Sequence, residues 1–106
     1  MSTRRIKVAK KSELAVGKGK AVMIQGQEIA VFHTEEGFFA CENACLHQGA
    51  PLDQGDLQGC MVICPWHAWK FNLKDGSFVS DPAFALKTYP VISEGEDLWI
   101  EFPSKN

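Results

Sequence analysis

The sequence predicts an all-β fold, and two observations support this prediction. Short apolar segments with turn signals between them recur along the chain, and little sustained helical periodicity is present. Residues 98–102 alternate well, with Leu98, Ile100 and Phe102 on one face of the predicted strand. Short strands at close spacing are typical of a β-barrel or a β-sandwich.

The clearest single element is a hairpin near the start of the chain. Residues 20–25 and 28–33 are apolar-rich and flank Gly26-Gln27, a Gly-X pair that suits a two-residue type II′ turn. The other predicted strands cover residues 4–8, 37–41, 60–64, 69–73, 86–92 and 98–102, with turn signals at 74–76 and 94–97.

Length and charge limit the possible functions. A chain of 106 residues with 45% hydrophobic residues suits one domain, residues 1–106. Its net charge of −2 is scattered, so we expect neither nucleic acid nor a membrane surface as a partner. The two arginines near the start lack the apolar run of an export signal, and no segment approaches transmembrane length. We therefore expect a cytoplasmic protein whose four cysteines are ligands or thiols rather than disulfides.

Two short segments contain candidate metal ligands. One residue separates Cys45 from His47, and two residues separate Cys64 from His67. Two sulfur and two nitrogen donors suit a tetrahedral zinc ion or an iron–sulfur centre with mixed ligation. Zinc fingers usually pair cysteine with cysteine and histidine with histidine, whereas each close pair here is mixed. In a two-iron cluster the neighbouring ligands can bind different iron atoms, which makes the one-residue gap reasonable.

The pattern CxH, then residues 48–63, then CxxH resembles the Rieske [2Fe–2S] family. The resemblance continues through Gly49-Ala50-Pro51-Leu52, Pro65 and Trp69-Lys70-Phe71, and it runs from about Arg4 to Phe102. It implies stacked antiparallel β-sheets with a cluster-binding subdomain formed by two loops at one tip, at about residues 43–52 and 62–71.

The same resemblance implies roles for individual residues. Cys45 and Cys64 would bind one iron of a single [2Fe–2S] cluster through sulfur, and His47 and His67 would bind the other iron through ring nitrogens. The segment SDPAFALKTYPV resembles the family's proline loop, at about residues 80–84, and would assign to Pro82 the role of closing over the cluster.

The ligand set and its surroundings predict the reduction potential. An oxidised two-iron core with two thiolates is neutral, whereas four thiolates make it anionic, so histidine ligation raises the potential. Respiratory members of the family have cysteine, serine or tyrosine side chains around the cluster, where this sequence has Ala50, Trp66, Trp69 and Phe71. None of these four has a hydroxyl group to donate to cluster sulfur. We therefore predict a potential near the lower end of the range of roughly −150 to +300 mV.

The features that are absent suggest an electron carrier rather than an enzyme. Oxygenase subunits with a Rieske domain also hold a mononuclear iron in a larger domain, and 106 residues leave no space for one. The sequence contains no nicotinamide or flavin fingerprint. We predict a Rieske-type ferredoxin that accepts one electron from a flavoprotein ferredoxin reductase and delivers it to a terminal oxygenase, such as an aromatic-ring hydroxylating dioxygenase.

Two alternatives remain open. The chain could be the small subunit of an NAD(P)H-dependent nitrite reductase, whose large subunit would then be the partner, since HAWKFNL resembles the corresponding stretch. From a different class comes a structural zinc module that mediates protein contacts, for which zinc without iron would be the evidence.

Some residues near the predicted ligands have simpler interpretations. Ala68 follows His67 where the family commonly has glycine, and we expect it at negative φ because positive φ costs alanine about 1–2 kcal/mol. Cys41 and Cys60 are expected to be small buried hydrophobes at strand ends, because free cysteine is commonly buried. A redox sensor at either residue would instead need a depressed thiol pKa. His33 is expected to be solvated at a strand end. Solvated surface is also the expectation for Glu35, Glu36, Asp53 and Asp56.

Overall fold

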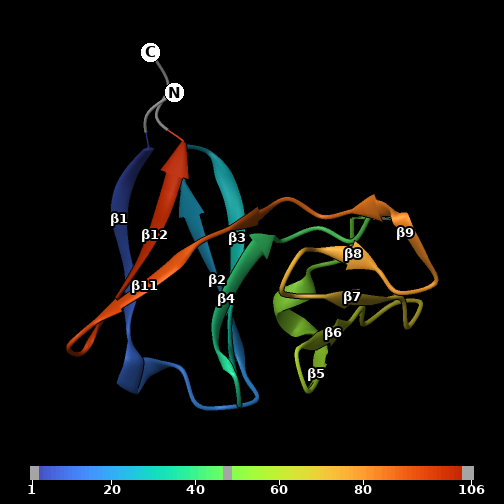
Figure 1. The fold of residues 1–106 in the computed structure, drawn as a ribbon, viewed down its shortest axis with the longest axis horizontal. Coiled ribbons are helices and arrows are strands. Elements are labelled where there is room, and N and C mark those ends of the chain that lie inside the picture. Colours follow the sequence, from blue (N-terminus) through green and yellow to red (C-terminus); the bar gives the residue numbers. More distant parts are fainter. Residues whose placement is uncertain (1–2, 47–48, 104–106) are drawn as a thin grey trace.

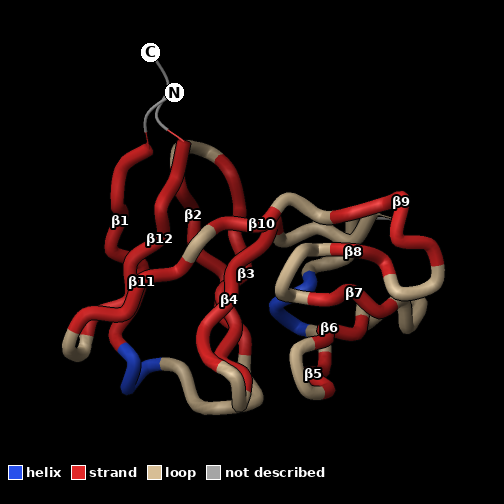
Figure 2. Tube along the Cα trace, viewed as in Figure 1, coloured by secondary structure: helices blue, strands red, loops and turns tan. Residues whose placement is uncertain are grey.

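A computed structural model describes residues 3–46 and 49–103 (Figure 1). Within this part of the chain the regular elements are β-strands and two short 3₁₀ helices, η1 (Lys11–Glu13) and η2 (Leu52–Gln54), as Figure 2 shows. Every strand pairing is antiparallel, so the all-β prediction is confirmed. Neither helix is long and apolar enough to span a membrane.

The strands form three sheets. The first has the order β1-β12-β11, the second β10-β4-β3-β2 and the third β5-β6-β7-β8-β9. The strands are β1 (Thr3–Lys10), β2 (Gly19–Ile24), β3 (Gln27–Thr34), β4 (Gly37–Glu42), β5 (Asp56–Gln58), β6 (Met61–Ile63), β7 (Lys70–Asn72), β8 (Ser77–Phe78), β9 (Asp81–Ala85), β10 (Thr88–Tyr89), β11 (Val91–Glu94) and β12 (Asp97–Pro103).

The first two sheets form a base, and the third sheet lies beside them in a small subdomain, residues 43–86 (Figure 1). The chain leaves the base after β4 and returns at β10. At this crossing the amide of Glu42 donates to the carbonyl of Lys87 at 2.9 Å, and the amide of Lys87 donates to Oε2 of Glu42 at 2.7 Å. The subdomain is therefore an insertion whose two ends are hydrogen-bonded to each other.

Strand β3 separates two hydrophobic cores because both of its faces are buried. Ile29 and Val31 pack in a base core, whereas Ala30 and Phe32 pack in a subdomain core, and all four side chains are completely buried. A strand covered on both faces has a continuous apolar sequence, as residues 29–32 do. The alternation predicted for β12 is also confirmed, since Leu98, Ile100 and Phe102 are its buried residues.

The predicted hairpin exists, but its turn is displaced by one residue. Ile24 pairs with Gln27, so the loop consists of Gln25 and Gly26 rather than Gly26 and Gln27. Both loop residues have positive φ, 50° and 82°, which is the signature of a type I′ turn and not of type II′. The difference arises because Gln25 adopts a left-handed conformation that sequence preferences assign to Asn, Asp or Gly.

The predicted strand 86–92 is two strands in different sheets. Pro90 lies between β10, which pairs with β4, and β11, which pairs with β12. Proline has no amide hydrogen to donate and so interrupts the ladder, and the chain changes sheet at this position. The short strands β5, β8 and β9 escaped prediction because they lack a long apolar segment.

Replacing Ile100 by alanine should lower the free energy of unfolding by about 2–5 kcal/mol, because Ile100 is completely buried in the base core. Glu101→Ala on the same strand is the matched control, with an expected effect below about 0.5 kcal/mol because Glu101 points to the other face. Urea unfolding of both variants checks the prediction, and equal losses would contradict this assignment of the two faces.

Candidate metal centre

The first predicted ligand loop is held at both ends by Asn43 and Asp53. The buried Asn43 donates from Nδ2 to Oδ1 of Asp53 at 2.7 Å, and the Asp53 amide donates back to Oδ1 of Asn43 at 2.8 Å. The amide of Asn43 also donates to the carbonyl of Glu28 on β3 at 3.0 Å. Asp53 therefore has a structural role, which corrects the expectation that it is solvated surface. Asn43 is a supporting residue that sequence reasoning missed.

Between these two residues the backbone closes into a hook around Cys45. The Cys45 amide donates to the carbonyl of Ala50 at 2.9 Å, and the Gly49 amide donates to the carbonyl of Cys45 at 2.8 Å. Gly49 has φ +72°, and a Cβ added there would meet open space. Only the backbone conformation therefore favours glycine at this position.

The second predicted ligand loop repeats this hook around Cys64, between β6 and β7. The Cys64 amide donates to the carbonyl of Trp69 at 2.7 Å, and the Ala68 amide donates to the carbonyl of Cys64 at 3.0 Å. Both bonds have the same residue offsets as in the first hook. The two sequence segments that contain the predicted ligands therefore share a repeated backbone structure.

The two hooks also share a left-handed backbone torsion, so the expectation that Ala68 has negative φ is wrong. Ala68 has φ +59° and occupies the position equivalent to Gly49, so it is left-handed and not at negative φ. The hydrogen bond from its amide to Cys64 requires the chain to turn back here, and the loop accepts the strain of a left-handed alanine to keep that bond.

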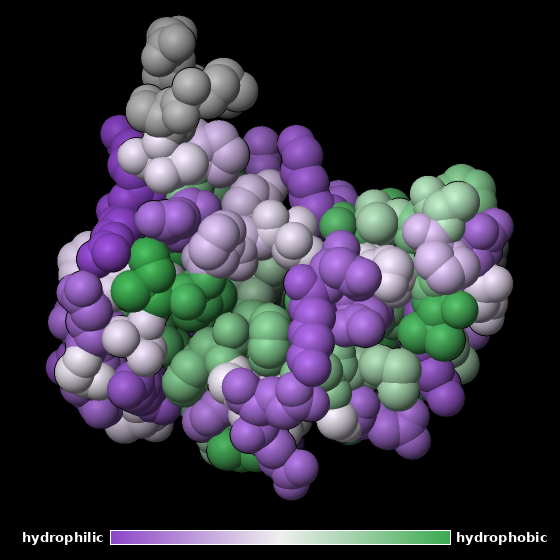
Figure 3. Space-filling model, viewed as in Figure 1, coloured by the Kyte–Doolittle hydropathy of each residue, from purple (hydrophilic) through white to green (hydrophobic). Residues whose placement is uncertain are grey.

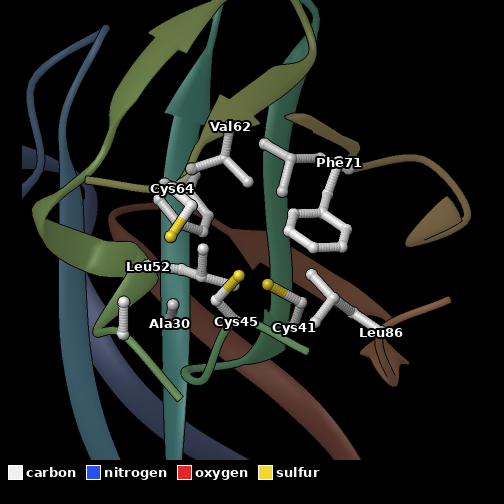
Figure 4. Packing of buried hydrophobic residues seen from close by; sticks show 11 residues of the cluster. Ala30, Cys41, Cys45, Leu52, Val62, Cys64, Phe71 and Leu86 are labelled. Carbon is white, nitrogen blue, oxygen red and sulfur yellow. The ribbon is translucent and has the colours of Figure 1, made fainter. Parts of the chain in front are cut away.

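The two hooks bring their cysteines into one hydrophobic group. Cys45 and Cys64 are 3% and 2% exposed and pack in the subdomain core with Ala50 and Leu52. Figure 4 shows both cysteines beside Leu52. Two thiols on separate loops are thus enclosed among apolar side chains. A buried thiolate needs a compensating positive charge, and a metal centre would supply it.

The predicted histidine ligands are only partly described. His67 is exposed, and its neighbours Pro65 and Trp66 are exposed as well. These residues line a hollow beside the second hook that reaches Cys64 and is bordered by Asp56. His47 lies outside the described residues. Among residues 3–46 and 49–103, no group of three or more histidine, cysteine or acidic side chains is close enough to hold a metal.

The burial and exposure of the predicted donors that are described suit an iron–sulfur centre with mixed ligation. The sulfur donors lie inside the subdomain and a histidine lies at its surface, which matches a cluster with one buried and one exposed side. Pro82, predicted to lie in a loop over the cluster, is an exposed residue of β9. Its role in covering a cluster stays a prediction.

Aromatic rings support the second hook. Trp69 stacks on Phe78 with ring centroids 4.1 Å apart and planes at 12°, and the centroids of Phe71 and Phe78 are 5.5 Å apart. Trp69 therefore packs against the aromatic side chains of the third sheet. Sequence reasoning missed Phe78 because it belongs to a strand of only two residues.

The remaining cysteines differ in their environment. Cys41 is completely buried in the subdomain core, and its burial, with a smaller effect from Glu42, raises the pKa of its thiol to about 12. This confirms it as a small hydrophobe and argues against a redox sensor. Cys60 is only partly buried and lies in the turn between β5 and β6, where its Sγ is 3.6 Å from Oγ1 of Thr34. The expectation of a buried strand-end residue is therefore wrong for Cys60.

His33 differs from the solvated residue that was expected, whereas Glu36 is exposed as expected. Nδ1 of His33 lies 2.7 Å from the carbonyl of Leu14, and its ring stacks on Phe38 at 4.0 Å. Glu36 forms an ion pair with Lys74 at 2.7 Å, which holds the pKa of its carboxyl below the ordinary value. His33 thus secures the base, and Glu36 links the base to the small subdomain.

The strained alanine gives a paired prediction. Ala68→Gly should raise the free energy of unfolding by about 0.5–1 kcal/mol, because relief of the left-handed penalty exceeds the entropy cost of glycine. Gly49→Ala should lower the free energy of unfolding by about 1–2 kcal/mol, because alanine would incur the left-handed penalty that glycine avoids. Denaturant unfolding checks both signs, and a loss of stability in Ala68→Gly would contradict the account.

The buried thiol of Cys41 predicts a pH dependence of stability. Its pKa is about 12 in the folded chain against an ordinary value of 9.0, so above pH 9.0 the unfolded state loses the proton first. The contribution of the protonated Cys41 thiol to the free energy of unfolding is fully present below pH 9.0 and declines as the pH rises towards 12. Relative to Cys41→Val, the wild type should lose about 1.4 kcal/mol per pH unit in this window. Unfolding of both proteins at several pH values measures the slope, and a constant difference would contradict it.

Comparison with known proteins identifies the family. The model of the Rieske [2Fe-2S] domain matches residues 4–90. A 3-phenylpropionate/cinnamic acid dioxygenase ferredoxin subunit from Shigella boydii serotype 4 is 38% identical over 91 residues, covering 83% of this chain and 86% of the relative. The resemblance seen in the sequence is therefore confirmed.

Solved structures show the same fold. The putative NADH-dependent nitrite reductase small subunit from Mycobacterium tuberculosis superposes with a TM-score of 0.91 at 22% identity, covering 99% of this chain and 100% of the other. A chain from a complex of reduced oxygenase and oxidized ferredoxin in carbazole 1,9a-dioxygenase gives a TM-score of 0.84 at 28% identity, with 96% of each chain covered. With its two equivalent hooks, buried cysteines and matched sequence, the chain belongs to the Rieske [2Fe-2S] domain family, whose cofactor is a Rieske-type [2Fe-2S] cluster.

Proposed function

We propose that this chain is a Rieske-type ferredoxin, a one-electron carrier between a flavoprotein reductase and a terminal oxygenase. The observation that carries the proposal is the pair of equivalent hooks that bury Cys45 and Cys64 in one core. The dioxygenase ferredoxin subunit that is 38% identical and matches over 83% of the chain supports the assignment of this role. The chain acts as the electron-transfer component of a larger system.

The ligand set that we propose is Cys45 and Cys64 on one iron and His47 and His67 on the other. Burial of the two cysteines and exposure of His67 support this division, because an exposed histidine places its iron nearest the partner. When bound, the cluster supplies a couple that accepts and releases one electron. The hooks exclude water from the cysteines and hold them at fixed positions in the fold.

The side chains around the hooks support a low potential. Ala50 and Phe71 are completely buried beside the cysteines and have no polar atoms on their side chains. Hydrogen bonds from hydroxyl groups to cluster sulfur would stabilise the added electron, and neither residue can donate one. The reduction potential should therefore lie near the lower end of the range of roughly −150 to +300 mV.

The partner reaches the cluster from the end of the small subdomain. The exposed surface of this subdomain includes four large apolar side chains, those of Leu46, Trp66, Val79 and Phe84. Figure 3 shows apolar surface over β9 and the turn before it. Such a surface suits transient contact with protein partners. We place the protein in the cytoplasm, where a reductase and an oxygenase would both be accessible.

The nitrite reductase alternative rests on weaker support. The small subunit of that type which superposes with this chain is 22% identical, a level at which the likeness concerns the fold. The dioxygenase relative, at 38% identity, favours the oxygenase system. Stopped-flow mixing of the reduced protein with a purified Rieske-type oxygenase should give electron transfer, whereas transfer only to a sirohaem-containing subunit would reverse the assignment.

Direct voltammetry tests the carrier role itself. We expect a reversible one-electron wave near the lower end of the Rieske range, together with iron and acid-labile sulfide in the purified protein. A colourless, zinc-loaded protein without a wave would establish the structural zinc module instead. A potential well above zero millivolts would contradict the argument from the missing hydroxyl groups.

His67→Cys should lower the potential by about 100 mV or more in any cluster that still assembles, because an additional anionic ligand opposes reduction. His33→Gln is the matched control, since His33 packs against Phe38 in the base, and its potential should equal that of the wild type. Protein-film voltammetry measures both. An unchanged potential in His67→Cys would show that His67 is not a ligand.

A further inference from the structure

The second hook contains a conformational conflict that the first hook lacks. Ala68 has φ +59° on an exposed loop, whereas the equivalent residue of the first hook is a glycine with φ +72°. An alanine keeps a left-handed conformation only where its surroundings hold it there. The hydrogen bond from the Ala68 amide to the carbonyl of Cys64 favours this conformation, and a contact that fixes the end of the hook would hold it further.

The aromatic stack is the contact in the right place. Phe71 and Phe78 pair directly across β7 and β8, so their side chains leave the same face of the sheet. Trp69, two residues before Phe71, shares that face and stacks on Phe78 at 4.1 Å and 12°. Because Phe71 is completely buried, the aromatic stack packs directly against the hydrophobic core.

The backbone connects this stack to the hook. The carbonyl of Trp69 accepts the amide of Cys64 at 2.7 Å and closes the hook, and the amide of Val79 donates to the carbonyl of Lys70 at 2.9 Å. Phe78 and Ala68 line the same hollow, and Ala68 also lines the separate hollow that Asp56 borders. Fixing the ring of Trp69 therefore fixes the last residue of the hook and limits the torsions open to Ala68.

We propose that Phe78 is a positioning residue for His67. By stacking on Trp69 it holds Ala68 in the left-handed conformation, and Ala68 directly follows His67 in the chain. Without the stack the hook relaxes, and the imidazole of His67 samples several positions. The inference rests on the proposed ligand role of His67, but its mechanism concerns only the contacts of the second hook.

The first test replaces Phe78 by leucine in the cluster-containing protein. We expect a broadened electron paramagnetic resonance spectrum of the reduced cluster, because His67 no longer has a single position. Cluster loss, followed by the decay of visible absorbance, should be roughly two- to tenfold faster. Phe78→Tyr keeps the ring and should restore wild-type behaviour. Phe38→Leu is the matched control, because Phe38 stacks on His33 and packs in the base core rather than against the second hook.

The decisive test combines Phe78→Leu with Ala68→Gly. Glycine adopts the left-handed conformation without strain, so the hook no longer needs the stack to hold it. The double variant should therefore have a narrower spectrum and slower cluster loss than Phe78→Leu alone. If Phe78→Leu has the same effect in the wild-type chain and in the Ala68→Gly background, the two sites are independent and the inference is overturned.

Two further outcomes separate this inference from the proposed function. A wild-type protein with a Rieske spectrum and a Phe78→Leu variant with unchanged line width and cluster loss would overturn the positioning role alone. A wild-type protein without a Rieske spectrum would overturn the proposed function, and this inference with it. If Phe78→Leu does not fold, Phe78→Met, whose flexible unbranched side chain adapts more easily to the space of the ring, takes its place in both tests with the same expected outcomes.

Discussion

The structure around the candidate centre depends on a pair of amide hydrogen bonds made twice. In each hook a cysteine amide reaches the carbonyl of the fifth residue after it, and the amide of the fourth residue returns to the cysteine carbonyl. These bonds satisfy backbone groups that would otherwise be buried without partners. They also require a left-handed residue at the fourth position. The placement of both thiols in the core and the strain at Ala68 follow from this single backbone requirement.

The two hooks satisfy that requirement with different means. The first hook uses glycine and a side-chain brace, in which Asn43 and Asp53 exchange hydrogen bonds across the loop. The second hook uses alanine and an aromatic stack on Phe78. A pair of part-buried hydrogen bonds fixes the ends of a loop, whereas a stack fixes the last residue before a strand. Equivalent backbones can thus be stabilised by unrelated contacts, which local sequence comparison of the two loops does not reveal.

The sequence predicted the features that repeat along the chain and missed those that depend on contacts between distant residues. The face of β12 and the hairpin β2–β3 followed from local apolar patterns. The family followed from the spacing of cysteine and histidine. The left-handed Ala68 could not be predicted, because the penalty for alanine is local, whereas the hydrogen bonds and rings that outweigh it come from Cys64 and Phe78. The bracing partner of Asn43 was hidden for the same reason, since it lies across a loop.

The insertion of the small subdomain between β4 and β10 affects how proteins of this type can be altered. Its ends meet where Glu42 and Lys87 exchange hydrogen bonds, so residues 43–86 form a cassette with a narrow neck. A cassette from a relative could be transplanted onto this base, provided that it preserves the packing against Ala30, Phe32 and Cys41. The packing between the cassette and the base, rather than the hydrogen bonds at the neck, would then decide whether a transplanted cassette folds correctly. Redox properties and partner choice can therefore diverge in the cassette while the base remains a common platform.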